Sequence, residues 1–295
     1  MMDSLIFLGL MFVGTFFLGL NDVLQRRYLL KGVNEQILLG FSFLVVGVIT
    51  FLSLFVFGFP EIKSGFWQAL GITAALGVIS QNVFMRALKI GEASMVSPLR
   101  LLTPPLVIIT GFLVLGEVTS LWGIIGIFIT IAGVWFLFPP AESVGIFHNF
   151  LKNLARPEVV LGILGSLLFA ISFPFDKKAV VTSSALFLTA TFFFVVGSAT
   201  LLLSSFRRNF RRELKSVWQW RYAVLSTGFI LILGALLTSQ ALNYSLASYA
   251  ASAKRMWAFW TVLLAGKFLS EKHIGRRLGA SAVMFSGILI TVFLG

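Results

Sequence analysis

Ten stretches of about 20 predominantly apolar residues follow one another along almost the whole chain. Each stretch is long enough to cross the hydrocarbon core of a bilayer as a helix. The connections between them are short, which leaves no room for a sizeable soluble domain. The apolar segments cover residues 4–24, 36–58, 65–86, 93–115, 119–138, 158–178, 184–206, 221–243, 248–269 and 275–294. The sequence therefore predicts an all-α membrane protein with ten transmembrane helices.

The composition excludes several other classes of protein. With 58% hydrophobic residues, 12% charged residues and a mean hydropathy of +0.97, the chain is far more apolar than a soluble protein. It has no Cys, and both His residues fall in predicted connections without metal-ligand spacing. The net charge of +12 comes mostly from basic residues that flank the apolar segments, as in membrane proteins. We therefore expect no metal, no cofactor and no nucleic-acid partner.

The chain repeats itself at an interval of 154 residues. The matching positions are Asp22 and Asp176, Ala87-Leu88 and Ala241-Leu242, Ala93-Ser94 and Ala247-Ser248, Arg100 and Lys254, Glu117 and Glu271, and Gly133 and Gly287. Matches across five segments indicate duplication of a five-helix unit. Because five is odd, the second unit enters the membrane from the opposite side, which predicts a 5+5 inverted repeat around a central cavity. We place the repeats at 1–141 and 158–295, with a connecting loop at 142–157.

Charge in the loops predicts the orientation in the membrane. Of the 23 Lys and Arg residues, 17 fall in loops after odd-numbered segments and 3 in loops after even-numbered segments. The positive-inside rule then places both termini outside the cytoplasm. The most basic connection, 207–221, is interpreted first as an anchor at the lipid headgroups and second as a lipid-sensing segment. We expect a multi-pass protein of a prokaryotic inner membrane, as a monomer or a homodimer.

Three cations, Arg100, Lys254 and Arg255, lie inside apolar segments. A charge in the hydrocarbon core costs at least about 2.5 kcal/mol, so it usually faces a cavity and meets a partner. Arg100 matches Lys254 across the repeat, and the three cations together predict one central site for an anion, best a dianion. Two alternatives remain open. The side chains could extend back to the headgroups, or the fourth helix could begin late, with Ser97 as cap and Pro98 in its first turn.

Other polar and aromatic residues are candidates for contact with a substrate. These residues are Gln81, Asn82, Gln240, Tyr244 and Trp257. The alternatives are hydrogen bonds between packed helices for the polar residues, and a lipid-facing or interfacial position for the aromatic ones. Glu117 and Glu271 close their segments, and we expect both to be structural groups at the interface.

The two matching acids, Asp22 and Asp176, could carry a proton and couple transport to a gradient. Each lies near the end of its predicted segment. Asp22 has Arg26 four residues further on, and Asp176 is followed directly by Lys177 and Lys178. Ion pairing at the membrane interface is therefore the favoured interpretation, and coupling is the alternative.

The pattern resembles the EamA-type carriers of the drug/metabolite transporter superfamily. The motifs that carry the resemblance are Ala87-Leu88 through Ala93-Ser94, Pro104, Leu115-Gly116-Glu117, and the second copies Ala241-Leu242, Ala247-Ser248 and Leu269-Ser270-Glu271. The resemblance implies a ten-helix inverted repeat whose first, third, fourth, sixth, eighth and ninth helices line a central cavity. It also implies cytoplasmic termini, which conflicts with the loop charges, so the transport direction stays open.

A narrower resemblance concerns the substrate. Lys254-Arg255 is similar to the phosphate-binding Lys-Arg pair of plastid triose-phosphate translocators, and Arg100 stands four residues before Pro104, where those carriers have a Lys. We therefore expect a secondary carrier, not an enzyme, that moves a small organic anion such as a phosphorylated metabolite by alternating access, with exchange as a plausible mode. The alternative is an amino-acid or drug/metabolite exporter. A lipid-modifying enzyme is disfavoured because no catalytic group accompanies the cations.

Overall fold

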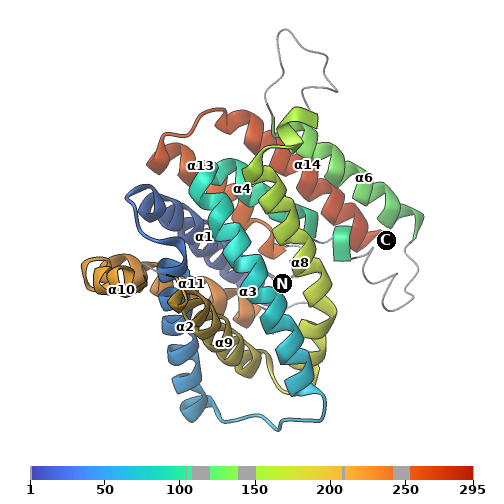
Figure 1. Cartoon of the computed structure of the whole chain (residues 1–295). Coiled ribbons are helices and arrows are strands. Elements are labelled where there is room, and N and C mark those ends of the chain that lie inside the picture. Colours follow the sequence, from blue (N-terminus) through green and yellow to red (C-terminus); the bar gives the residue numbers. More distant parts are fainter. Residues whose placement is uncertain are drawn as a thin grey trace.

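The fold was analysed in a computed structural model, which describes residues 2–103, 105–107, 120–138, 151–207, 210–241 and 253–294. Every regular element in these ranges is a helix (Figure 1). The helices are α1 (Met2–Leu30), α2 (Glu35–Phe57), α3 (Phe66–Ile90), α4 (Ala93–Leu99), the 3-10 helix η1 (Arg100–Leu102), α6 (Leu121–Phe136), α8 (Pro157–Val181), α9 (Ala185–Ser205), α10 (Phe210–Gln219), α11 (Arg221–Gln240), α13 (Trp257–Leu269) and α14 (Ile274–Phe293).

Polar side chains mark where several helices begin. The Asn34 side chain caps α2 by accepting hydrogen bonds from the backbone N–H groups of Gln36 and Ile37, at 2.9 and 3.2 Å. Ser184 caps α9 in the same way, by accepting from Phe187 N–H at 3.1 Å. Pro157 occupies the first position of α8, where the missing N–H costs nothing. At these helix starts, a side chain accepts from the free backbone N–H groups, or a proline has no N–H that needs an acceptor.

Six helices of the described chain are long and apolar enough to span a membrane. They cover Leu5–Leu30, Glu35–Phe57, Phe66–Ile90, Pro157–Val181, Ala185–Ser205 and Arg221–Thr238. Large apolar side chains such as Phe55, Val56, Phe57 and Phe128 are exposed on the outside. Such a surface suits lipid, because contiguous exposed apolar area is rare on soluble monomers. The prediction of an all-α membrane protein is confirmed at this level.

Two helix pairs each contain two close contacts of a glycine. Within each pair, the residues of one contact match those of the other at an interval of 154 residues. A side chain at Gly133 would collide with Met284, and one at Gly287 would collide with Thr130, where α6 packs against α14. A Cβ at Gly40 would lie 2.6 Å from Leu201, and one at Gly47 would lie 2.6 Å from Phe194, where α2 packs against α9. Figure 1 shows α6 and α14 side by side. The glycines therefore allow close approach between helices, as small residues do in membrane bundles.

The fourth predicted segment departs from a continuous helix over 93–115. The helix α4 ends at Leu99, and η1 follows, in which Thr103 N–H bonds the carbonyl of Arg100. Residue 104 is a proline and supplies no N–H for that carbonyl, which favours the tighter hydrogen bond. The late start with Ser97 as cap is wrong, because α4 already begins at Ala93 and Pro98 lies inside it. The chain also turns at Arg255 and Met256, before α13.

Candidate functional site

A cavity of about 230 Å³ lies among helices from both halves of the chain. Its lining comes from α1, α2, α3, η1, α8, α9, α11 and the chain entering α13. The lining residues are Leu18, Asn21, Asp22, Gln25, Phe43, Gln81, Arg100, Thr103, Phe169, Phe173, Asp176, Phe193, Leu231, Lys254, Arg255 and Trp257. This volume has room for several water molecules or a small solute.

The three intramembrane cations meet at this cavity. Arg100 and the pair Lys254-Arg255 come from the two local breaks in helical structure, on η1 and just before α13. The guanidinium of Arg100 lies 4.1 Å from the ring centre of Phe84, and that of Arg255 lies 5.4 Å from the ring centre of Trp257. Aromatic faces stabilise cations away from water. The two breaks therefore place all three basic side chains around one space, and aromatic rings contact the two guanidinium groups.

Partners for these cations are few. Among the described residues, Asp22 is the one acid in ion-pair contact with them, at 3.5 Å from Arg100 Nη1. The Nε groups of Arg100 and Arg255 are buried and have no hydrogen-bond partner in the described chain. Buried donors are normally satisfied, and an unsatisfied charged donor is costly. The arginines at this cavity therefore carry charged donor groups that the described chain does not satisfy.

The prediction for Asp22 was interfacial pairing with Arg26, and this is wrong. Asp22 is buried, accepts a 2.7 Å hydrogen bond from Ser97 Oγ and pairs with Arg100. Arg26 instead donates to the carbonyls of Leu88 and Lys89. The reason is that α1 continues to Leu30, six residues beyond the predicted segment, so Asp22 is not at a helix end.

Asp176 also lines the cavity and not the membrane interface. Its carboxylate accepts hydrogen bonds from the Thr73 hydroxyl and, at 3.5 Å, from Ser172 Oγ. The aromatic residues Phe169 and Phe173 line the cavity from the same helix, α8. In contrast to Asp22, Asp176 has no ion-pair partner among the described residues. The two matching acids are therefore in different electrostatic settings.

The remaining candidates divide between the cavity and other places. Gln81 and Trp257 line the cavity. Asn82 lies on another side of α3, where its amide donates to Val78 O at 2.7 Å and to Thr200 Oγ1 at 3.1 Å. Gln240 is exposed and does not line the cavity, and Tyr244 lies outside the described residues. Asn82 thus has the helix-bridging position that was the alternative for these polar residues.

Sequence reasoning missed the rest of the lining. On α1, the lining residues Leu18, Asn21 and Gln25 share one helix face with Asp22. Counted from Leu18, the other three follow at positions +3, +4 and +7, which is the spacing of one face of a helix. Phe169 and Phe173 lie seven and three residues before Asp176 on α8, with the same spacing. Helical periodicity around the two matching acids was therefore the signal that could have found them.

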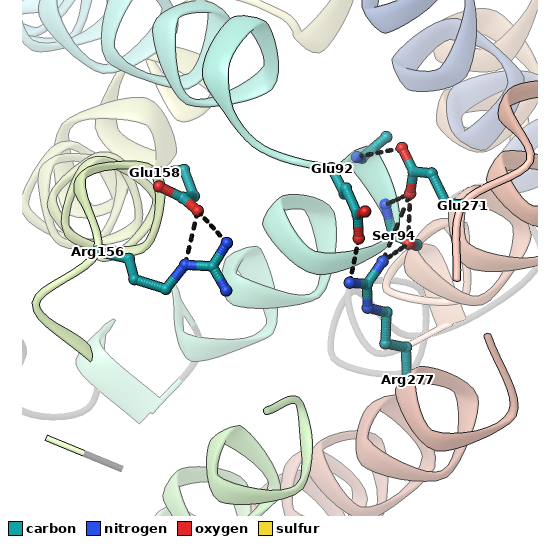
Figure 2. Close-up of polar contacts among 7 residues, drawn as sticks. Glu92, Ser94, Arg156, Glu158, Glu271 and Arg277 are labelled. Atoms are coloured by element: carbon teal, nitrogen blue, oxygen red, sulfur yellow. Dashed lines mark hydrogen bonds and ion pairs between the residues drawn. The ribbon is translucent and has the colours of Figure 1, made fainter. Parts of the chain in front are cut away.

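A second polar cluster joins the start of α4 to the chain between α13 and α14 (Figure 2). The Glu271 carboxylate accepts the backbone N–H groups of Ala93 and Ser94, at 2.8 and 2.9 Å, and the Ser94 hydroxyl. Arg277 lies 3.6 Å from Glu271 and also contacts Ser94 and Glu92. Glu271 therefore acts as the missing N-terminal cap of α4, from the other half of the chain. Its sequence match, Glu117, lies outside the described residues.

Comparison with known proteins adds the family. Residues 5–138 and 156–293 each match the EamA-like transporter family. A search of curated proteins gives no match. One crystal structure, described only as that of a protein, is 13% identical, covers 97% of both chains and superposes with a TM-score of 0.62, which shows a shared fold. Together with the apolar helices, these matches identify a multi-pass membrane protein, and the chain belongs to the EamA-like transporter family of the drug/metabolite transporter superfamily.

Proposed function

We propose that this transporter is a secondary carrier that moves a small organic anion through the central cavity by alternating access. The observation that carries the proposal is the charge of the lining, where three cations outnumber two acids, only Asp22 of which is ion-paired with a cation in the described chain. Two buried arginine Nε groups of this lining also lack hydrogen-bond partners there. An anion that enters would satisfy donors that are otherwise costly to bury. The cost of burying these donors without a partner also favours exchange, because a carrier that returns with another anion always has an anion beside its cations.

The chemistry of the cations favours a substrate with two negative charges. The fork of an arginine suits phosphate or carboxylate, and the ammonium of Lys254 adds a compact charge beside it. A phosphate ester can accept from all three cations at once, whereas a lone carboxylate has only two oxygens. The similarity of Lys254-Arg255 to the triose-phosphate translocator pair supports the same class of substrate.

The proposed architecture is ten transmembrane helices in a 5+5 inverted repeat. Two observations support it: the family matches the chain twice, and the glycine contacts of α6 with α14 and of α2 with α9 recur at positions 154 residues apart. Such a repeat gives two related arrangements of one scaffold, each open to one side. The orientation predicted from the loop charges, with both termini outside, belongs to this proposal.

The repeat predicts that matching glycines are equally intolerant of side chains. Gly133→Leu and Gly287→Leu should each lower the melting temperature of the purified protein, and by similar amounts, because overpacking costs about 1–3 kcal/mol. Gly9→Leu is the matched control, since nothing lies within 4 Å of a Cβ there. Thermal unfolding in detergent provides the measurement. A large effect at one position and none at the other would contradict equivalent packing.

Asp176 is the residue that we propose for coupling to a proton gradient. Asp22 is ion-paired with Arg100, whereas the partners of Asp176 in the described chain are hydroxyls, so the Asp176 carboxylate faces the cavity without a counter-ion there. Asp176→Asn should keep solute exchange but lose uphill accumulation driven by a pH gradient. Proteoliposome uptake with and without the gradient measures both. Unchanged accumulation in Asp176→Asn would rule out this role, and loss of exchange would make Asp176 a binding residue.

A second candidate function is export of amino acids or related metabolites. It is favoured by the same Asp176, because a carboxylate beside Phe169 and Phe173 suits an ammonium group, while one cation holds the substrate carboxylate. The test is uptake into proteoliposomes of phosphate esters, carboxylates, amino acids and cationic drugs. Preference for dianions supports the organic-anion carrier. Preference for zwitterions at equal size would replace it with the exporter.

A further inference from the structure

The connection between α9 and α11 carries a short helix that has few contacts with the rest of the protein. The helix α10 (Phe210–Gln219) projects from one side of the bundle, next to α2 and α11 (Figure 1). In the first half of the chain, the corresponding connection at 58–65 contains no helix. The helix α10 is therefore an addition on one face of the molecule, and bundle formation does not explain it.

The sequence of α10 divides into two faces. Phe210, Leu214, Val217 and Trp218 are spaced as one helix face. Leu214 and Trp218 are exposed, Trp218 by 76%, so much of this apolar face is not covered by the described protein. The intervening positions are basic or polar with one acid, namely Arg211, Arg212, Glu213, Lys215, Ser216 and Gln219. This combination is the signature of a helix that lies in the plane of a membrane surface.

The residues on either side of α10 add further exposed aromatic side chains and further basic residues. Phe206 and Tyr222 are exposed by 81% and 69%, and Arg207 is exposed next to Phe206. The Arg221 guanidinium lies 4.8 Å from the ring centre of Trp218 and 4.6 Å from that of Tyr222. Its Nη1 donates to Trp218 O at 2.8 Å, which fixes the side chain. Exposed aromatic rings beside a fixed cation are typical of the aromatic belts of membrane proteins.

We propose that α10 and its flanks form an interfacial surface that binds anionic phospholipid headgroups. The apolar face enters the boundary between headgroups and acyl chains, and the cations lie at the level of the phosphates. Basic residues near an anionic surface each strengthen such binding about fivefold. Charge complementarity identifies lipid as the occupant, since six of the 23 Lys and Arg residues lie between 207 and 221. The proposal does not depend on the transported substrate.

The depth of Trp218 tests the membrane position. The full-length protein and Trp218→Phe are reconstituted in vesicles whose lipids carry bromine near the headgroup end of the acyl chain. The difference between their emission spectra isolates Trp218 among the seven tryptophans. Strong quenching of this component by brominated lipid, with little quenching by aqueous iodide, is expected. Quenching by iodide and none by brominated lipid would overturn the proposal, and would favour a soluble protein partner instead.

The charge requirement is tested by lipid-dependent stability. Phosphatidylglycerol added to phosphatidylcholine nanodiscs should raise the melting temperature of the wild type, because a ligand of the folded state stabilises it. Arg207→Gln with Lys215→Gln should lose most of that rise. Lys63→Gln with Lys178→Gln removes two exposed cations elsewhere and should retain it. An equal phosphatidylglycerol effect in both double variants, or none in the wild type, would overturn anionic-lipid binding by α10.

Discussion

Replacement of Lys254 or Arg255 by alanine is expected to reduce solute uptake at least about tenfold while the protein still folds. Each change removes a charged donor from the cavity, and hydrogen bonds to charged groups contribute about 1.5–3 kcal/mol. Folding should survive, because neither cation is ion-paired within the described chain and their removal leaves no buried anion alone. Uptake into proteoliposomes, with the same lipid-to-protein ratio for every variant, provides the measurement.

Arg100 should behave differently from the other two cations. It pairs with Asp22, so Arg100→Ala leaves a buried carboxylate without its partner and should lower both uptake and stability. Lys178→Gln is the matched control, since it removes one exposed cation away from the cavity lining. Wild-type uptake in both Lys254→Ala and Arg255→Ala would contradict an anion site at these residues.

The second large effect concerns stability. Arg277→Ala is expected to lower the melting temperature strongly, because the Arg277 and Glu271 side chains are 7% and 6% exposed, so the change leaves a buried carboxylate without its ion-pair partner. Breaking a buried ion pair costs about 3–5 kcal/mol. Glu271→Ala should be similarly severe, since it also leaves the Ala93 and Ser94 N–H groups without their acceptor.

Figure 2 contains the control for this prediction. Arg156 also pairs with a glutamate, Glu158, at 2.6 Å, but the arginine is 45% exposed. Glu158 is 10% exposed, but its partner reaches solvent, which screens the pair, so Arg156→Ala should lower the melting temperature clearly less than Arg277→Ala. Equal melting temperatures for Arg277→Ala and Arg156→Ala would mean that the cluster around Glu271 does not hold α4 in place.

Much of the fold could be predicted from the sequence because the bilayer imposes strong rules. A helix must be apolar and of known length, and a charge inside it must face a cavity. These two rules, together with the internal repeat, predict that Arg100, Lys254 and Arg255 meet at one site. The helix ends were harder, since Arg26 and Arg27 end the apolar run while α1 continues to Leu30. That error displaced Asp22 from the cavity to the interface.

The rest depended on features that hydropathy and the internal repeat do not register. The break at η1 follows from hydrogen bonding near Pro104, which hydropathy does not register. The contact of Glu271 with Ala93 and Ser94 joins residues in different halves, and no local pattern encodes it. Gln81 and Asn82 are neighbours of similar chemistry, and only the packing of α3 decides that Gln81 lines the cavity. Long-range packing therefore decided these points.

The most direct test of the central claim is ligand-dependent melting of the detergent-purified protein, for the wild type and for Lys254→Ala. The ligands are inorganic phosphate, sugar phosphates, phosphoenolpyruvate, amino acids and cationic drugs. A ligand that binds the folded state raises the melting temperature by mass action. An anion site at Lys254 predicts stabilisation by the phosphorylated compounds that disappears in Lys254→Ala. Stabilisation only by amino acids or cations, equal in both proteins, would contradict it.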